Sequence, residues 1–287
     1  MIPAPFAYHR PRSLEDTLGL LAEHGEDARV VAGGHSLIPM MKLRLARPEH
    51  LVDLRDLEEL RGIRAELDSL TIGALTTQHE LIGSALLAEK CPILRETSLQ
   101  IADPQVRYCG TLGGNLANGD PGNDMPAVMM ALDATYQLKR RGEEREVAAR
   151  DFYEGAFATA LRPEEILASV RIPMPPAGHG YAYEKQKRKV GDYATAAAAV
   201  ILTMSGGTCA AAAIALTNVG DTPLLAEDAG QALLGTALDD AAIAQAERNA
   251  RTIARPVTDG HGPAEFRTHI AGIMVRRALM RAKERAA

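Results

Sequence analysis

The chain has 287 residues, 46% of them hydrophobic and 24% charged, which is typical of a folded protein with two or three domains. Its formal net charge of -5 and isoelectric point of about 5.9 disfavour a polyanionic partner, so we expect no nucleic acid. The 3 cysteines include no C-x-x-C pair and the 8 histidines no H-E-x-x-H motif, so the sequence predicts no metal site in this chain.

The N-terminal segment has prolines and the pair His9 and Arg10 where a secretory signal requires an apolar run. The longest apolar run, residues 196–204, is far shorter than the roughly 20 residues that cross a bilayer. We therefore expect a cytoplasmic protein whose membrane contact, if it has one, is peripheral and at the inner face.

Residues 1–54 predict a small β-α-β domain. Ser13, with a carboxylate three residues later, indicates a capping box, and leucines at helical spacing continue until Gly25 ends the helix. Residues 29–32 are expected to form a strand that leads into a glycine pair, and residues 51–54 form the next strand.

Short strands and helices alternate between residues 55 and 177 and predict an α+β domain. Gly142, in a run of charged residues, indicates a hairpin turn. Pro175 and Pro176, followed by Gly178, indicate a linker, and we place a domain boundary there. The other expected elements are strands at 70–72 and 134–138 and helices at 77–88 and 125–132.

Residues 178–287 are expected to form a C-terminal α+β domain of antiparallel strands and helices. Residues 181–187 and 208–217 are strand candidates. The alanine-rich segment 196–203 fits either a strand or a buried helix, because alanine leaves the periodicity undecided. After Asn218 the pattern becomes helical.

Two glycine pairs stand beside hydroxyl or amide side chains. Because glycine has no Cβ, its backbone can approach a ligand closely, and successive N–H groups can form a concave anion site. Neither pair belongs to a G-x-G-x-x-G or P-loop motif, so a Rossmann fold is not expected, and each pair alone could be a simple tight turn. The first glycine motif is Ala32, Gly33, Gly34, His35 and Ser36, and the second is Thr111, Leu112, Gly113, Gly114 and Asn115.

The combination AGGHS, TLGGN after IADPQVRYCG, and NGDPGNDMPA resembles the FAD-binding subunits and domains of the molybdenum hydroxylases, relatives of xanthine dehydrogenase. The segments FATALRPEEILASVRIP and KRKVGDYATAAAAV are similar to carbon monoxide dehydrogenase medium subunits in particular. The resemblance implies a PCMH-type (vanillyl-alcohol-oxidase-like) FAD-binding fold with a C-terminal α+β domain. It also implies that the two glycine motifs wrap the FAD diphosphate and the adjacent sugar.

The same resemblance assigns five more residues to the cofactor. Asp124 would bond the ribityl and ribose hydroxyls, although capping a helix is an equal and compatible role for it. Lys185 would compensate negative charge on flavin or phosphate, and Tyr193 would lie against the isoalloxazine ring. Ile101 and Leu161 match positions near the flavin, and for both a plain core role is the alternative.

The resemblance implies an oxidoreductase subunit without catalytic side chains of its own. Such a subunit passes electrons from [2Fe–2S] clusters through FAD to an external acceptor, a quinone, which is also where membrane contact would arise. Carbon monoxide would be oxidised to carbon dioxide on a partner. The implied partners are a small subunit with two [2Fe–2S] clusters and a large subunit with a molybdopterin-type molybdenum cofactor, assembled as a dimer of heterotrimers.

Three alternatives remain open from the sequence. The complex could act on an aldehyde, an N-heterocycle or an aromatic thioester instead, since the substrate binds to the large subunit. The chain could be a flavin-free scaffold subunit, although its glycine pairs are intact. It could also be an independent oxidase with covalently attached FAD.

Overall fold

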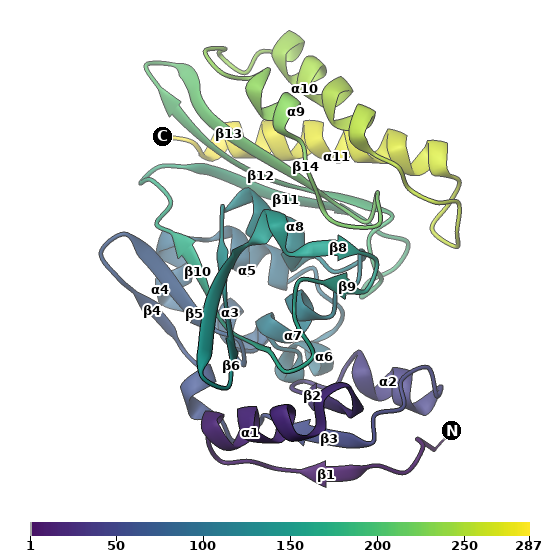
Figure 1. The fold of residues 1–287 in the computed structure, drawn as a ribbon. Helices are drawn as coiled ribbons and strands as arrows, with labels where there is room; N and C mark the ends of the chain where they lie inside the picture. The colour runs from purple at the N-terminus through teal and green to yellow at the C-terminus, as the bar shows by residue number, and fades with distance from the viewer. Residues whose placement is uncertain (1) are drawn as a thin grey trace.

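The computed structural model describes residues 2–287, and its three larger sheets follow one another along the chain (Figure 1). In Figure 1 the N-terminal sheet lies at the bottom, the middle sheet in the centre and the C-terminal sheet at the top. Each sheet is built from one stretch of sequence, and helices accompany all three. The α+β fold class is confirmed. The proposed domain limits, 1–54, 55–177 and 178–287, stay a prediction.

The N-terminal sheet is parallel and has the strand order β1-β3-β2. Ser13 caps its first helix as predicted, accepting a hydrogen bond from Asp16 N at 3.1 Å, and Gly25 ends that helix at φ 49°. The reciprocal bond of a capping box, from Ser13 N to the Asp16 carboxylate, is absent among the described residues. Strand β1 was not predicted, because its three residues are largely exposed and carry no apolar pattern. The elements are β1 (Ala7–His9), α1 (Leu14–His24), β2 (Ala28–Val31), α2 (Leu37–Lys42) and β3 (His50–Asp53).

The middle sheet is antiparallel, with the order β4-β5-β10-β6-β7. The predicted hairpin is confirmed, because Arg140 pairs with Glu143 across a turn in which Gly142 has φ 73°. The strands are β4 (Ile63–Ala65), β5 (Ser69–Gly73), β6 (Thr135–Arg140), β7 (Glu143–Ala148) and β10 (Ile166–Pro173), with a separate pair formed by β8 (Tyr153–Gly155) and β9 (Ala158–Thr159).

Short helices lie between the middle sheet and the C-terminal sheet (Figure 1). The single helix expected over residues 77–88 is wrong, because Ser84 adopts an extended conformation and caps a new helix by accepting from Leu87 N at 3.2 Å. The helices are α3 (Gln78–Gly83), α4 (Ala85–Lys90), α5 (Ile93–Ser98), α6 (Pro104–Cys109), α7 (Leu112–Ala117) and α8 (Met125–Ala131). Short 3-10 helices lie at Gly25–Asp27, Glu58–Leu60 and Ala149–Asp151.

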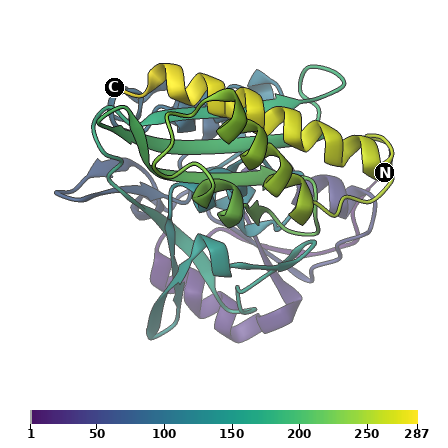
Figure 2. The ribbon, with the colours of Figure 1, turned by 90° about the horizontal axis from the view of Figure 1, so that it is seen from above.

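The C-terminal sheet is antiparallel, with the order β11-β12-β13-β14, and Figure 2 shows its helices lying across one face. The alanine-rich segment is a strand and not a helix. Ala196 and Ala198 face the helices on that side, whereas Ala197 and Ala199 join the core of the middle domain. The elements are β11 (Gly180–Gln186), β12 (Ala196–Ser205), β13 (Thr208–Thr217), β14 (Leu224–Leu225), α9 (Glu227–Gln231), α10 (Asp240–Ile253) and α11 (Ala264–Arg285).

The chain returns at its end to the linker that opens the C-terminal domain. After α11, the backbone N–H of Ala287 donates to the carbonyl of Gly178 at 3.0 Å. The end of α11 therefore lies beside the start of β11. Throughout residues 2–287, every helix is too short or too polar to span a bilayer.

Candidate cofactor-binding site

A cavity of about 820 Å³, here called the cofactor cavity, is lined by residues from all three sheets and their connections. Its size falls in the range of about 300–1,000 Å³ that is usual for small-molecule and cofactor sites. The residues predicted from the sequence converge on it with one exception. Those that line it are Ala32, Gly33, Gly34, His35, Ser36, Ile101, Thr111, Gly113, Gly114, Asn115, Asp124, Leu161, Lys185 and Tyr193.

The first glycine motif lines this cavity with residues whose backbone amides are free. Within residues 2–287, the N–H groups of Gly33, Gly34, His35 and Ser36 have no protein acceptor. Gly34 has φ 73°, a conformation that glycine adopts at little cost. The loop is therefore a concave run of free donors, which is the arrangement that binds an anion.

Gly33 lets the first motif close on the segment that precedes the second. A Cβ atom at Gly33 would lie 2.3 Å from the carbonyl oxygen of Cys109 and 2.8 Å from Cα of Gly110. Both atoms belong to backbone, which cannot move aside easily. The two glycine motifs are thus neighbours in space, although they are far apart in the sequence.

The second glycine motif is the start of helix α7 and not an open loop. Thr111 caps the helix, and its Oγ1 accepts from Gly114 N at 3.1 Å. The amides of Leu112 and Gly113 donate to the carbonyls of Thr76 and Ala74, both at 2.8 Å. The expected row of free amides is therefore wrong for this motif.

Leu112 is the predicted site residue that does not line the cavity. Its side chain is fully buried in the core of the middle domain. Gly113 packs against Ala74, the residue after β5, so closely that a Cβ at Gly113 would lie 2.5 Å from that of Ala74. The second motif therefore forms a packed wall of the cavity, and Thr111 and Asn115 are among its lining residues.

A buried ion pair stands at the cavity wall. Lys185 Nζ donates to Asp124 Oδ2 at 2.7 Å, and the hydroxyl of Tyr183 donates to Asp124 Oδ1 at 2.5 Å. Burial raises the pKa of Asp124, and the Lys185 ammonium and the Tyr183 hydroxyl act in the opposite direction. Burial and the adjacent carboxylate raise the pKa of Tyr183 well above its ordinary value, so its phenol remains a hydrogen-bond donor.

Asp124 does not cap helix α8. It precedes the helix, but both of its oxygens bond to side chains of β11, and the amide of Met125 donates to Asn115 Oδ1 at 3.3 Å instead. The helical-cap alternative for Asp124 is therefore wrong. A carboxylate oxygen has more than one acceptor position, so Asp124 can still accept from a ligand hydroxyl.

The other predicted residues differ in their exposure. Tyr193 is half exposed and packs beside Gly122, and burial of its phenol, followed by nearby Asp120, raises its pKa to about 12. Ile101 is buried in the core of the middle domain, and Leu161 packs on the edge of that core. Both also line the cavity, so a core role and a cofactor role are compatible for them.

Gln78 and Tyr183 were missed by sequence reasoning. Gln78 lines the cavity and is 2% exposed; its Oε1 accepts from the Ser98 hydroxyl at 2.9 Å, while its Nε2 has no partner in the part of the chain that the structure describes. Nothing in the sequence marks it. Tyr183 had a signal, because residues two apart on a strand share a face and Lys185 was already a candidate.

These features fit a flavin dinucleotide. The free amides of the first motif and the unpaired amide of Gln78 are donors, and Asp124 offers acceptor oxygens. Lys185 provides a cation held by a carboxylate, and Tyr193 provides an aromatic surface. A diphosphate, sugar hydroxyls and a flavin ring require this set of groups.

Comparisons with known proteins agree along the whole chain. Residues 4–175 match the family described as "FAD binding domain in molybdopterin dehydrogenase", and residues 181–282 match "CO dehydrogenase flavoprotein C-terminal domain". The carbon monoxide dehydrogenase medium chain of Afipia carboxidovorans is 64% identical, with 100% of this chain and 99% of that protein covered. The medium chain of Hydrogenophaga pseudoflava is 46% identical, with full coverage of both.

A solved structure shares the fold. The crystal structure of the Cu,Mo-CO dehydrogenase in its cyanide-inactivated form contains a chain with 64% sequence identity and a TM-score of 0.98, and 100% of both chains is covered. Both matched family descriptions are of flavoprotein domains, and together they account for most of the chain. The chain therefore belongs to the family of FAD-binding flavoprotein subunits of the molybdenum hydroxylases, which includes the carbon monoxide dehydrogenase medium chains.

Proposed function

We propose that this chain is the FAD-binding electron-transfer subunit of a carbon monoxide dehydrogenase. It would pass electrons from [2Fe–2S] clusters of a partner through FAD to an external quinone during oxidation of CO to CO2. The observation that carries the proposal is 64% identity to a carbon monoxide dehydrogenase medium chain over the full length. Relatives named for caffeine and 6-hydroxypseudooxynicotine dehydrogenases are 35% and 36% identical, so a different substrate is less well supported.

The first glycine motif would hold the cofactor diphosphate. Its four free amides, from Gly33 to Ser36, would replace the water that otherwise solvates the phosphate oxygens. The side chains of Thr111 and Asn115 would complete the site from the wall formed by α7. Binding by neutral donors suits a chain whose net charge is negative.

The ion pair of Lys185 and Asp124 would lie beside the flavin half of the cofactor. The Lys185 ammonium would compensate negative charge on the flavin or the phosphate, and Asp124 would accept from cofactor hydroxyls. Tyr193 would cover one face of the ring. Flavin accepts electrons singly or in pairs, and this links iron–sulfur carriers with a two-electron acceptor.

A flavin-free scaffold is less well supported by the same geometry. The N–H groups of the first motif and Nε2 of Gln78 have no protein acceptor in residues 2–287. Nε2 of Gln78 is buried, and a buried polar group without a partner costs about 1–3 kcal/mol, whereas the residues of the first motif are half-buried or exposed. A fold that had lost its ligand would have no reason to retain these unpaired donors around a cavity of cofactor size.

The proposed assembly has two further subunits. A small subunit would supply two [2Fe–2S] clusters and a large subunit the molybdopterin-type cofactor, in a dimer of heterotrimers. The complex would be cytoplasmic, and quinone reduction would place it against the inner face of the membrane. The identity to complete medium chains of such enzymes supports these partners.

Co-purification tests the proposal. A tagged full-length chain, expressed with the genes beside it, should bring down two partners in a complex that contains flavin, iron and molybdenum. The complex should reduce a dye with carbon monoxide as the electron donor. Dye reduction by an aldehyde or an N-heterocycle, but not by carbon monoxide, would assign another hydroxylase. A colourless complex would indicate a scaffold, and acid-stable flavin with turnover by the isolated chain would indicate a separate oxidase.

A further inference from the structure

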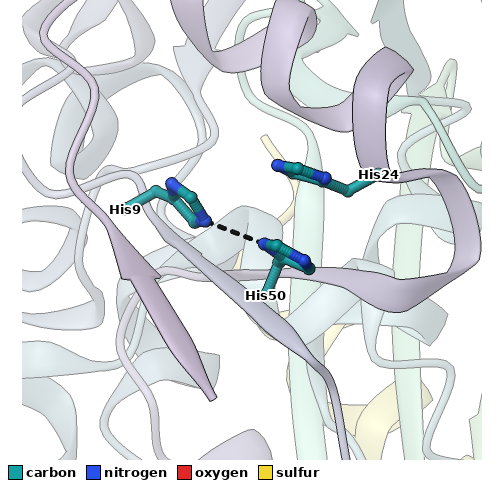
Figure 3. Close-up of side chains that lie close together, drawn as sticks. All are labelled: His9, His24 and His50. Carbon is teal, nitrogen blue, oxygen red and sulfur yellow. Dashed lines mark hydrogen bonds between the residues drawn. The ribbon is translucent and has the colours of Figure 1, made fainter.

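Three histidine side chains from three different elements meet on the N-terminal sheet (Figure 3). His9 is the last residue of β1, His24 ends α1, and His50 begins β3. One ring nitrogen of each lies within 4.8 Å of those of the others, and all three residues are half-buried. We call this group the histidine cluster.

The sheet and its helix bring the cluster together. Ala7 lies opposite His50 in the parallel pair of β1 and β3, so their side chains share a face, and His9, two residues after Ala7, shares it too. Helix α1 covers this face, since Leu21 packs in the core of this domain. At the end of α1, the ring of His24 stacks on that of His50 with centroids 3.7 Å apart (Figure 3).

The ring nitrogens have few partners. His9 Nε2 and His50 Nδ1 share a hydrogen bond of 2.9 Å, and within residues 2–287 no carboxylate or carbonyl holds any of the three rings. Each of the three rings therefore keeps at least one nitrogen without a protein partner in the described residues, and imidazole nitrogen is the commonest protein ligand of metal ions.

We propose that His9, His24 and His50 bind one divalent transition-metal ion of the class that prefers imidazole, such as Zn²⁺. Three protein nitrogens plus a water is an established Zn²⁺ coordination set, with Zn–N bonds of about 2.0–2.1 Å. The rings must turn out of their stack for their lone pairs to converge on the ion. When the rings rotate, His9 and His50 lose their mutual hydrogen bond, and each forms a bond to the metal ion instead.

The surrounding charges favour a cation at this position. Glu23 precedes His24 on α1 and lines the same surface cavity as His9. The nearby guanidinium of Arg10 is already paired with Asp56, with Nε 2.7 Å from Oδ2. The same cavity is also lined by Arg12 and Arg141 and by Glu15 and Asp16, so with Arg10 paired to Asp56 its carboxylates outnumber the remaining guanidiniums.

The site would add a link between parts of the N-terminal domain that already meet through strand pairing and through the core packing of α1. A bound ion would tie the exposed edge strand β1 to the central strand β3 and to α1. Among the described residues that line the cofactor cavity, none belongs to the histidine cluster. The sequence predicted no metal site because the three ligands lie in separate elements, so no spacing motif reveals them. This inference does not depend on the proposed electron-transfer function.

Zinc titration of the full-length chain tests the inference. The chain, treated with a chelator and desalted, would be titrated with ZnCl₂ by calorimetry, alongside His24→Gln and His9→Gln. His24 is the better variant because its side chain makes no hydrogen bond in residues 2–287, so its loss should leave the fold intact. His269→Gln, at an exposed histidine on α11, is the matched control.

Wild type and His269→Gln should bind one equivalent, and either cluster variant should bind at least about tenfold more weakly. Zn²⁺ should raise the melting temperature of the wild type and the control but not of the variants. Cobalt should give the strong visible absorption of four-coordinate Co²⁺ only where the cluster is intact. Equal zinc affinity in all four proteins, or no stoichiometric binding by the wild type, would overturn the inference.

Discussion

Lys185 and Asp124 form an ion pair of 2.7 Å whose side chains are 1% and 5% exposed. Lys185 belongs to β11 of the C-terminal sheet, whereas Asp124 precedes α8 in the middle part of the chain. The pair therefore crosses between the two parts at the wall of the cofactor cavity. Its charges are removed from water, so each depends on the other for its stability.

Replacing Lys185 by methionine should leave the Asp124 carboxylate buried without its cation. We expect Lys185→Met to lower the free energy of unfolding by about 3 kcal/mol and to reduce flavin content. Asp124→Asn in the same chain should restore part of the stability, because it removes the unpaired charge. Urea unfolding and flavin absorbance measure the two effects. Lys189→Met, at an exposed lysine of the next loop, is the control and should change neither.

Gly34 and Gly142 allow a paired test of the first glycine motif. Both have φ 73°, so alanine at either should cost about 1 kcal/mol of stability through backbone strain. At Gly34 a Cβ would also lie 2.6 Å from Cδ1 of Ile38, whereas at Gly142 it would meet open space. We expect Gly34→Ala to lose flavin and Gly142→Ala to keep it. Equal flavin content in the two variants would count against the motif as the diphosphate site.

Gln78 should bind the cofactor through its unpaired Nε2. Gln78→Met removes this donor and the bond to Ser98, and each neutral hydrogen bond contributes about 1 kcal/mol. We expect FAD affinity, measured by flavin fluorescence, to fall about tenfold, which corresponds to about 1.4 kcal/mol. Ser98→Ala loses the same internal bond but keeps the amide, so it should retain most of the affinity. If Gln78→Met bound FAD as tightly as wild type, the assignment would fail.

Glu165 should make stability depend on pH in the acid range. Burial acts to raise its pKa, but the Arg145 guanidinium, at 2.7 and 2.8 Å, and the Arg162 amide, at 2.9 Å, outweigh this, and the pKa is lowered. The contribution is therefore present above the unfolded pKa of about 4.3 and lost as the pH falls through the folded value.

The corresponding variant is Glu165→Gln. It should lower the unfolding free energy at pH 7 by about 2 kcal/mol and flatten its decline between about pH 5 and pH 3. Glu154→Gln, at an exposed carboxylate, is the control and should leave the curve of unfolding free energy against pH unchanged. A Glu165→Gln curve parallel to that of the wild type would contradict the assigned pKa shift.

Local signals predicted much of the fold. Strand β13 has the predicted limits. Helix α1 begins after Ser13 and ends at Gly25 as predicted, and Gly142 lies in the predicted hairpin turn. The failures have physical reasons. Edge strand β1 buries too little to show a pattern, and the alanines of β12 suit a helix as well as a strand until both sheet faces are covered.

The candidate site was only partly accessible from the sequence. Family resemblance identified the two glycine motifs. It did not reveal that the amides of the second motif are already bonded, to the Thr111 side chain at the start of α7 and to the carbonyls of Thr76 and Ala74. Tyr183 could have been found by its alternation with Lys185. Gln78 could not have been found from the sequence. Its candidate role depends on the hydrogen bond from Ser98 to Oε1 and on the lack of a protein partner for Nε2 in the described residues, and both follow from tertiary packing.

The contact between Ala287 and Gly178 brings the end of α11 back to the start of β11. Within the described residues, the C-terminal sheet takes no strand from the other sheets. It is nevertheless not an independent body, because α5 and α8 pack on its strands, and Ala197, Ala199 and Ala215 belong to the same hydrophobic core as the middle sheet. A substitution on that face of β12 or β13 should therefore displace the helices that stand beside the cofactor cavity.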